Sequence, residues 1–175
     1  ESDGSYARFE DYQANWLSDN PAKSAREIRA FTNTYRLLGS TYLNWKLAPQ
    51  WQWRSTVSTD VAFVTDRQFK SPLTSDAEPV GGEAFEAGFR NLTWLNENTL
   101  NYTAQFGRSQ LSVLGGATFQ KTTVDRNAAL GQGFPPVGGL ERVSSAANIL
   151  SALSTGSGFG LVSFLGRANY DFDSR

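Results

Sequence analysis

The side chains that could do chemistry are few in this sequence and lie far apart. Cys, His and Met are absent from all 175 residues, which excludes thiol nucleophiles, Cys/His zinc sites and Ser-His-Asp triads. Asp60 and Glu97 are candidates for the paired carboxylates of a glycosidase. They fall in separate segments without a local motif, so we interpret them as solvated or ion-paired side chains. We therefore expect no enzyme, no metal site and no cofactor.

A set of polar side chains recurs at alternate positions of segments that otherwise alternate with apolar residues. Alternate residues of a β-strand share one face, so these side chains line a common surface. That surface is a candidate for contacts with polar solutes or with another part of the protein. A simpler interpretation is that its residues only satisfy one another's hydrogen bonds. The candidate residues are Arg54, Asp60, Glu97, Asn101 and Arg167.

Four phenylalanines, Phe69, Phe85, Phe89 and Phe134, fall in two segments that we predict to be long loops. Binding residues concentrate on loops that a rigid scaffold holds in place. These rings are candidates for stacking on sugar rings or for packing against a partner. The alternative is that they fold each loop onto itself.

The elements that position these residues are predicted to be strands. The stretch LNYTAQFGRSQLSVLGGATF, residues 100–119, contains two alternating runs around a short polar turn. Its period of two predicts a hairpin with one apolar and one polar face. The same alternation elsewhere completes an all-β antiparallel meander of about five long strands. The predicted strands are residues 28–47, 51–66, 92–106, 110–124 and 160–172.

The predicted connections alternate between short and long. Short turns are predicted at 48–50 and 107–109, and long loops at 67–91 and 125–159, while residues 1–27 are predicted to be a polar loop. Short turns at one end of a sheet and long loops at the other are typical of a transmembrane β-barrel.

A short helix is predicted in the second long loop. Val143, Ala146, Ala147 and Leu150 have helical spacing within LERVSSAANILSAL.

The spacing of aromatic residues favours lipid over a protein core on the apolar face. One group lies near the predicted short turns and another near the long loops, and Trp51 and Phe63 are twelve positions apart. That separation spans about 40 Å along a strand, or about 28 Å of bilayer at a tilt of about 45°. The alternative is a soluble all-β carbohydrate- or protein-binding module. The aromatics are Trp45, Trp51, Trp53, Phe106, Tyr170 and Phe172 near the turns, and Phe31, Phe63, Trp94 and Phe119 near the loops.

Bulk properties exclude other classes of partner. The net charge is −1, with Lys and Arg dispersed along the chain, so we expect no nucleic-acid partner. No apolar run approaches the length of roughly 18 residues that a membrane helix requires. This does not count against a barrel, because alternating strands average out as polar.

Several of these segments also resemble a known family. The stretch TWLNENTLNYTAQFGRSQLSVLGGATFQ is similar to a hairpin of the SusC/RagA family of TonB-linked outer-membrane transporters. The string YRLLGSTYLNWKLAPQWQWRSTVSTD resembles an earlier hairpin of that family, and FLGRANYDFDSR resembles a later strand. The piece GQGFP, followed by the predicted short helix, also fits. The resemblance covers residues 20–175, in family order.

The resemblance implies an outer-membrane location and the import of glycans or peptides, driven through TonB. It implies that the polar face lines a lumen and that the outward loops meet a SusD-like surface lipoprotein. The family's plug, TonB box and signal sequence have no counterpart in these residues, and five strands are far fewer than the 22 of such barrels. We therefore expect a fragment whose partners include the remainder of the barrel, the plug and outer-membrane lipid.

Overall fold

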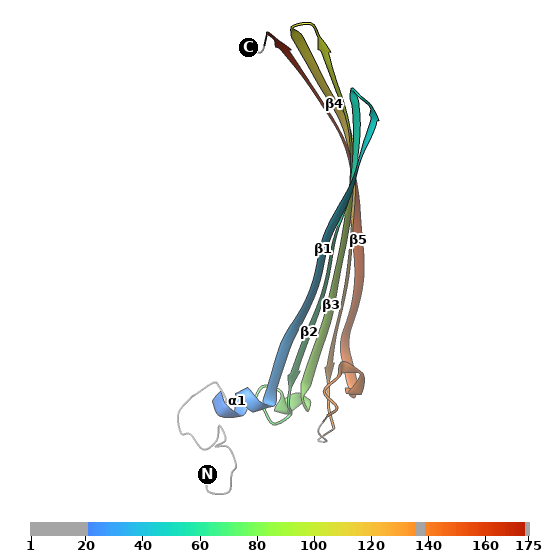
Figure 1. The fold of residues 1–175 in the computed structure, drawn as a ribbon. Coiled ribbons are helices and arrows are strands. Elements are labelled where there is room, and N and C mark those ends of the chain that lie inside the picture. The colour runs from blue at the N-terminus through green and yellow to red at the C-terminus, as the bar shows by residue number, and fades with distance from the viewer. Residues whose placement is uncertain (1–20, 136–138, 174–175) are drawn as a thin grey trace. The chain divides into compact units, whose positions relative to one another are not determined.

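A computed structural model of the chain describes residues 21–135 and 139–173 and shows one antiparallel sheet (Figure 1). The strand order is β1-β2-β3-β4-β5, so each strand pairs with its neighbours in sequence. The predicted five-stranded meander is confirmed. The elements are α1 (Pro21–Glu27), β1 (Ile28–Ala48), β2 (Trp51–Lys70), η2 (Glu78–Val80), β3 (Glu83–Phe106), β4 (Ser109–Gln132), η3 (Val143–Ser145) and β5 (Asn148–Phe172).

The two tight turns lie where the sequence predicts them. Pro49 and Gln50 connect β1 to β2, and Gly107 and Arg108 connect β3 to β4. Gly107 has a φ of 60°, a left-handed conformation that glycine adopts without steric cost. These turns fix the register of both hairpins.

The two long connections are shorter than predicted. Residues 67–70 belong to β2, residues 83–91 to β3, residues 125–132 to β4 and residues 148–159 to β5, so the loops shrink to residues 71–82 and 133–147. Glycines in these segments indicated loops, but Gly88 has a packing role. A Cβ added at Gly88 would lie 2.5 Å from Oδ1 of Asn127. Here glycine marks a close approach within a strand rather than a turn.

Two further local predictions need correction. Among the described residues of the second loop, the helix is limited to the three-residue 3-10 helix η3, because Ala146 is extended at φ −70° and ψ 141° and β5 already includes Leu150. The predicted polar loop 1–27 ends in the helix α1, which begins with Pro21, a residue well suited to a first helical turn. Residues 1–20 of that predicted loop lie outside the described residues.

The chain forms two compact units, each of which includes parts of all five strands. The loop unit comprises residues 21–35, 63–89 and 125–155, and the wall unit comprises residues 36–62, 90–124 and 156–173, as far as these are described. The loop unit contains a small core of Ala84, Phe134 and Val143. Phe69, Ala129 and Ala146 pack around that core.

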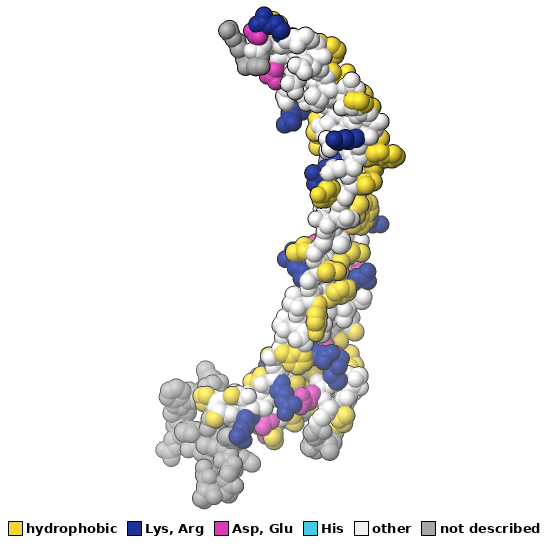
Figure 2. Space-filling view, viewed as in Figure 1, with side chains coloured by type: hydrophobic (Ala, Val, Ile, Leu, Met, Phe, Trp, Pro, Cys, Tyr) yellow, Lys and Arg dark blue, Asp and Glu magenta, His cyan; other side chains and the backbone are white. Residues whose placement is uncertain are grey.

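The wall unit has no comparable core. Thr122 is its only buried residue among those described, and large apolar side chains lie open on its strands. Trp45 is 59% exposed and Phe164 is 80% exposed. Figure 2 shows such hydrophobic side chains on the visible surface. Within residues 21–135 and 139–173, no helix has the length and apolar character needed to cross a membrane.

Candidate functional site

The polar face of the wall unit is held together by contacts between neighbouring strands. Arg36 donates from Nε and Nη2 to the two carboxylate oxygens of Asp60, at 2.9 and 2.7 Å. The Arg54 guanidinium lies over the Tyr42 ring, 4.4 Å from its centroid. This face therefore carries a bidentate ion pair and a cation–π contact, both between β1 and β2.

The same face continues across β3 and β4. The hydroxyls of Thr93 and Thr122 lie 3.0 Å apart and share a hydrogen bond. Next to this pair, a shallow hollow of about 480 Å³ is lined by residues of β1, β2 and β3, among them Leu38, Asp60 and Thr93. The hollow combines hydroxyl, carboxylate and apolar groups, so it presents a mixed surface to a polar ligand.

The five predicted polar residues have different surroundings. Asp60 and Arg54 are engaged by Arg36 and Tyr42, partners that the sequence analysis did not identify. Among the described residues, Glu97, Asn101 and Arg167 make no hydrogen bond or ion pair through their side chains. Asp60 thus balances a guanidinium, and nothing in its contacts links it to Glu97 as an acid–base pair.

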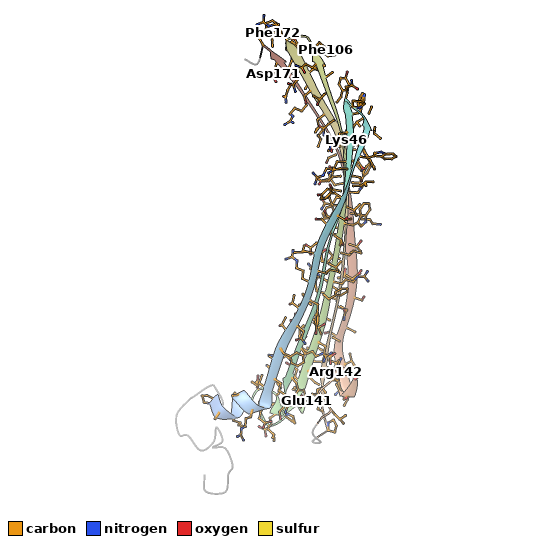
Figure 3. All side chains as sticks on the ribbon, in the orientation of Figure 1. Lys46, Phe106, Glu141, Arg142, Asp171 and Phe172 are labelled. Atoms are coloured by element: carbon orange, nitrogen blue, oxygen red, sulfur yellow. The ribbon has the colours of Figure 1, made fainter. Side chains whose placement is uncertain are left out.

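Aromatic side chains dominate the apolar face of the wall unit. The rings of Trp51 and Tyr102 lie with centroids 4.7 Å apart. The hydroxyls of Ser109 and Tyr170 are 2.8 Å apart and share a hydrogen bond. Phe106 and Phe172, both labelled in Figure 3, are exposed. Because the wall unit is part of a single sheet, these rings are not packed between two layers.

The structure also places three polar residues on this apolar face that the sequence analysis did not single out. Asn98 donates from Nδ2 to Asn96 Oδ1 at 2.6 Å, and Asn96 donates to Ser55 Oγ and the Thr56 carbonyl at 3.3 and 3.2 Å. Asn96 and Asn98 occupy the same set of every-second positions as Trp94 and Leu100. This spacing could have assigned them to the apolar face from the sequence. Mutual hydrogen bonds lower the cost of placing amides in apolar surroundings.

The prediction that four phenylalanines lie in loops is wrong for three of them, because Phe69 belongs to β2 and Phe85 and Phe89 belong to β3. Phe134 is only 7% exposed and meets Phe69 edge-on, with centroids 5.2 Å apart. Phe89 lies under the Arg126 guanidinium at 5.4 Å, and Phe85 is exposed. Phe134 therefore belongs to the core of this unit and Phe69 packs against it, whereas Phe89 is half-buried and Phe85 is at the surface.

Ion pairs tie the second loop to the strand ends within the loop unit. Arg142 donates from Nε and Nη2 to Glu86 at 2.5 and 2.8 Å, and the Val143 amide adds a bond to Glu86 Oε1 at 3.2 Å. Arg29 donates to Glu141 at 2.6 Å. The hydrogen bond from Arg142 is the main reason that the pKa of Glu86 lies below its usual value. Figure 3 labels Glu141 and Arg142.

A second pair stabilises the first loop. Lys70 donates from Nζ to Asp76 Oδ2 at 2.8 Å, and this hydrogen bond lowers the pKa of Asp76 while raising that of Lys70. Asp76 and Glu86 are therefore ionised at neutral pH, and their ion pairs anchor the two loops. No cluster of three or more acidic residues suited to a metal ion occurs among the residues that the structure describes.

The chain resembles known proteins in both sequence and fold. No protein-family model matches the sequence. The TonB-dependent receptor P26 of Formosa agariphila is 32% identical over 185 aligned residues, which cover 99% of this chain and 18% of that protein. The RagAB peptide transporter structure matches with a TM-score of 0.81 at 18% identity, over 93% of this chain and 19% of its own. The RagAB peptide importer in the 'open-open' state matches with a TM-score of 0.78 at 16% identity, over 98% and 19% respectively.

Over nearly all of its length the chain is similar to part of a TonB-dependent receptor, and it has the fold of part of the RagAB structures. The family resemblance of the sequence motifs is confirmed by the receptor relative, and the barrel-like fold by the RagAB structures. The chain spans about a fifth of the length of these proteins.

The first and last strands of the sheet are open. Every residue of β5 is exposed, and so is every residue of β1 between its two end positions. The inner strands β2, β3 and β4 are mostly half-buried by contrast. An open strand edge presents unpaired backbone groups that cannot face lipid. The segment therefore requires flanking strands of the receptor on both sides if it lies in a membrane.

Proposed function

We propose that this segment is part of the wall of an outer-membrane importer, with its apolar face toward lipid and its polar face toward the lumen. The observation that supports this most is the exposure of aromatic rings on a single-layered sheet, which has no second layer to cover them. In a bilayer these rings occupy the two interfaces, where Trp and Tyr are favoured.

The polar face would supply contacts for solute and plug in this proposal. The Arg36–Asp60 pair and the Thr93–Thr122 hydrogen bond keep its charged and polar groups satisfied in the absence of solute. Glu97, Asn101 and Arg167 keep free hydrogen-bonding capacity, so they are the candidates for contacting solute. Glycans or peptides are the proposed cargo. Energy for transport would come through TonB acting on the plug, and the segment itself would perform no catalysis.

A SusD-like lipoprotein is the proposed partner of the loop unit. Phe85 and Phe89 belong to one alternating set of β3 positions, whereas Ala84 and Glu86, which contact the second loop, belong to the other. Alternation assigns Phe89 to the sheet face opposite the folded loop, whereas Phe85 also lines a pocket together with Glu86 and Arg142. Phe134, which is buried, has no surface to offer a partner. We propose Phe85 and Phe89 as contact residues for this partner at the mouth of the lumen.

A complementation assay tests the import proposal. A strain that lacks the full-length receptor should lose uptake of fluorescent oligopeptides or oligosaccharides and regain it with the wild-type gene. A protonophore should abolish the regained uptake. The receptor should also float with membranes and require detergent for extraction. Recovery of the full-length protein as a soluble monomer would instead support the soluble all-β binding module.

A further inference from the structure

A pocket in the loop unit lies beside the ends of β1, β2 and β3 and the second loop. Its volume is about 200 Å³, below the range typical of drug-sized ligands but sufficient for a small head group. Charged residues and one aromatic ring line it. We call it the rim pocket; the lining residues that matter here are Arg29, Phe31, Arg67, Glu86, Glu141 and Arg142.

The charges of the rim pocket do not cancel. Arg29 is paired with Glu141, and Arg142 is paired with Glu86. Arg67 is left without an ion pair or hydrogen bond among the described residues. The pocket therefore carries an excess of one positive charge, and this charge belongs to Arg67.

The Arg67 side chain has a hydrogen-bond donor without an acceptor. Its Nε is buried and lacks a hydrogen-bond partner. Its guanidinium carbon lies 5.6 Å from the centroid of the Phe31 ring, which is within the range of a cation–π contact. A buried donor without an acceptor is costly, so a ligand oxygen at this position would be favoured.

The position of the pocket indicates where that oxygen comes from. Arg67 and Phe63 are four positions apart in β2, so their side chains are on the same face of the sheet. Arg67 lies over the Phe31 ring, which places Phe31 on that face as well. Phe31 and Phe63 are 45% and 48% exposed and belong to the aromatic group near the loops. If those rings mark the outer boundary of the bilayer, the next groups along the strand meet lipid head groups.

We propose that the rim pocket binds the phosphate of an anionic lipid head group, with Arg67 as the principal donor. The proposal rests on the proposed function, because it requires this face to meet lipid. A guanidinium matches phosphate oxygens with two parallel hydrogen bonds. Acyl chains lying on the exposed rings of Phe31 and Phe63 would add contacts that free phosphate cannot make.

The test uses the full-length receptor in bilayer nanodiscs. Nanodiscs of phosphatidylcholine, with or without phosphatidic acid as the phosphate-bearing probe, are analysed by native mass spectrometry for retained lipid. We expect retention of phosphatidic acid over phosphatidylcholine, and a loss of about tenfold in apparent affinity in Arg67→Gln. Arg67→Lys should retain part of the affinity because it keeps the charge.

Arg126→Gln is the matched control. Arg126 also lies over a phenylalanine ring, with its guanidinium carbon 5.4 Å from the centroid of Phe89. Phe89 and Glu86 are three positions apart in β3, so alternation assigns Phe89 to the sheet face opposite Glu86 of the rim pocket. This variant should bind phosphatidic acid like the wild type. Equal losses in both variants, or no preference for phosphatidic acid in the wild type, would overturn the proposal.

Two further arms separate the possible failures. Inorganic phosphate should compete poorly with phosphatidic acid; full competition would assign the pocket to soluble phosphate and overturn the lipid assignment. Each variant is also checked for the heat-dependent gel mobility of a folded barrel. A receptor that never enters the nanodiscs as a folded barrel contradicts the proposed function itself, whereas a folded barrel without lipid preference contradicts only the rim pocket.

Discussion

The loop unit and the wall unit are built from the same five strands but are stabilised in different ways. The loop unit buries Ala84, Phe134 and Val143 and fastens its two loops with ion pairs. The wall unit buries only Thr122 among its described residues and leaves its largest side chains open. One sheet thus includes a part with its own core and a part whose apolar face has none.

The difference shows which part depends on its surroundings. Apolar burial contributes roughly 25 cal/mol per Å², and the wall unit obtains little of it within this chain. In the proposed function, lipid and the remaining strands of the barrel would supply that hydrophobic stabilisation. The loop unit by contrast obtains part of its packing from its own core of Ala84, Phe134 and Val143.

The largest expected difference between the units concerns core truncation. Phe134→Ala should destabilise the loop unit by about 3–5 kcal/mol, because a buried ring is removed and a cavity remains. Hydrogen exchange of residues 125–135 in the full-length receptor measures this as faster opening. Phe106→Ala, at an exposed position of the wall unit, should leave exchange almost unchanged. Equal effects would contradict the contrast between the units.

A charge scan of the wall unit tests its two faces next. Leu100→Arg places a cation on the apolar face and should destabilise the folded barrel by about 2–4 kcal/mol if that face meets the bilayer centre. Asn101→Arg, one residue further on the polar face, should cost far less. Urea unfolding in lipid vesicles measures both. The proposed orientation fails if Asn101→Arg is the more damaging change.

The ion pair of Glu86 predicts a pH dependence of the loop unit. The Arg142 hydrogen bond lowers the pKa of Glu86 below its ordinary value of 4.5. A carboxyl with a lowered pKa stabilises the fold above its unfolded-state pKa, and this stabilisation disappears as pH falls through the folded-state pKa. Limited proteolysis of the second loop should therefore be constant at neutral pH and accelerate below about pH 4.

Glu86→Gln is the control for that titration. It should cleave faster than the wild type at neutral pH and show a weaker acceleration in acid. The effect should be smaller than that of Phe134→Ala, because the Arg142 side chain is 52% exposed and solvent screens the pair. An unchanged acid response in Glu86→Gln would assign the effect to another group, with Asp76 as the next candidate.

The smallest expected difference concerns glycines. Gly88→Ala in the loop unit should cost about 1 kcal/mol, because the new methyl group displaces the Asn127 side chain. Gly115→Ala in the wall unit meets nothing within 4 Å and should be neutral. Thermal unfolding of the two variants compares them directly. A neutral Gly88→Ala would show that Asn127 moves aside without cost.

The strands and turns could be predicted because they depend on local pattern. Period-two alternation located all five strands, and Pro49 and Gly107 marked the tight turns. The loop boundaries were wrong because glycine signals both turns and close packing, and only the structure shows Asn127 beside Gly88.

The side-chain contacts of the candidate site could not be predicted as well as the strands and turns. The Asp60–Arg36 pair and the burial of Phe134 depend on residues that are distant in sequence, and alternation does not specify their partners. Alternation could have assigned Asn96 and Asn98 to the apolar face. Their hydrogen bonds with each other and with Ser55 require the register between β2 and β3.

The most direct test of the membrane-wall account is an accessibility scan along β3 from Trp94 to Phe106 in the full-length receptor in bilayers. Each residue is replaced in turn by a spin-labelled cysteine, and collisions with oxygen and with a water-soluble nickel complex are measured. We predict a period of two, with even-numbered positions favouring oxygen most strongly near residues 98–100 and odd-numbered positions favouring the nickel complex. Even-numbered positions that favour the nickel complex, or that are shielded from both reagents, would contradict the account.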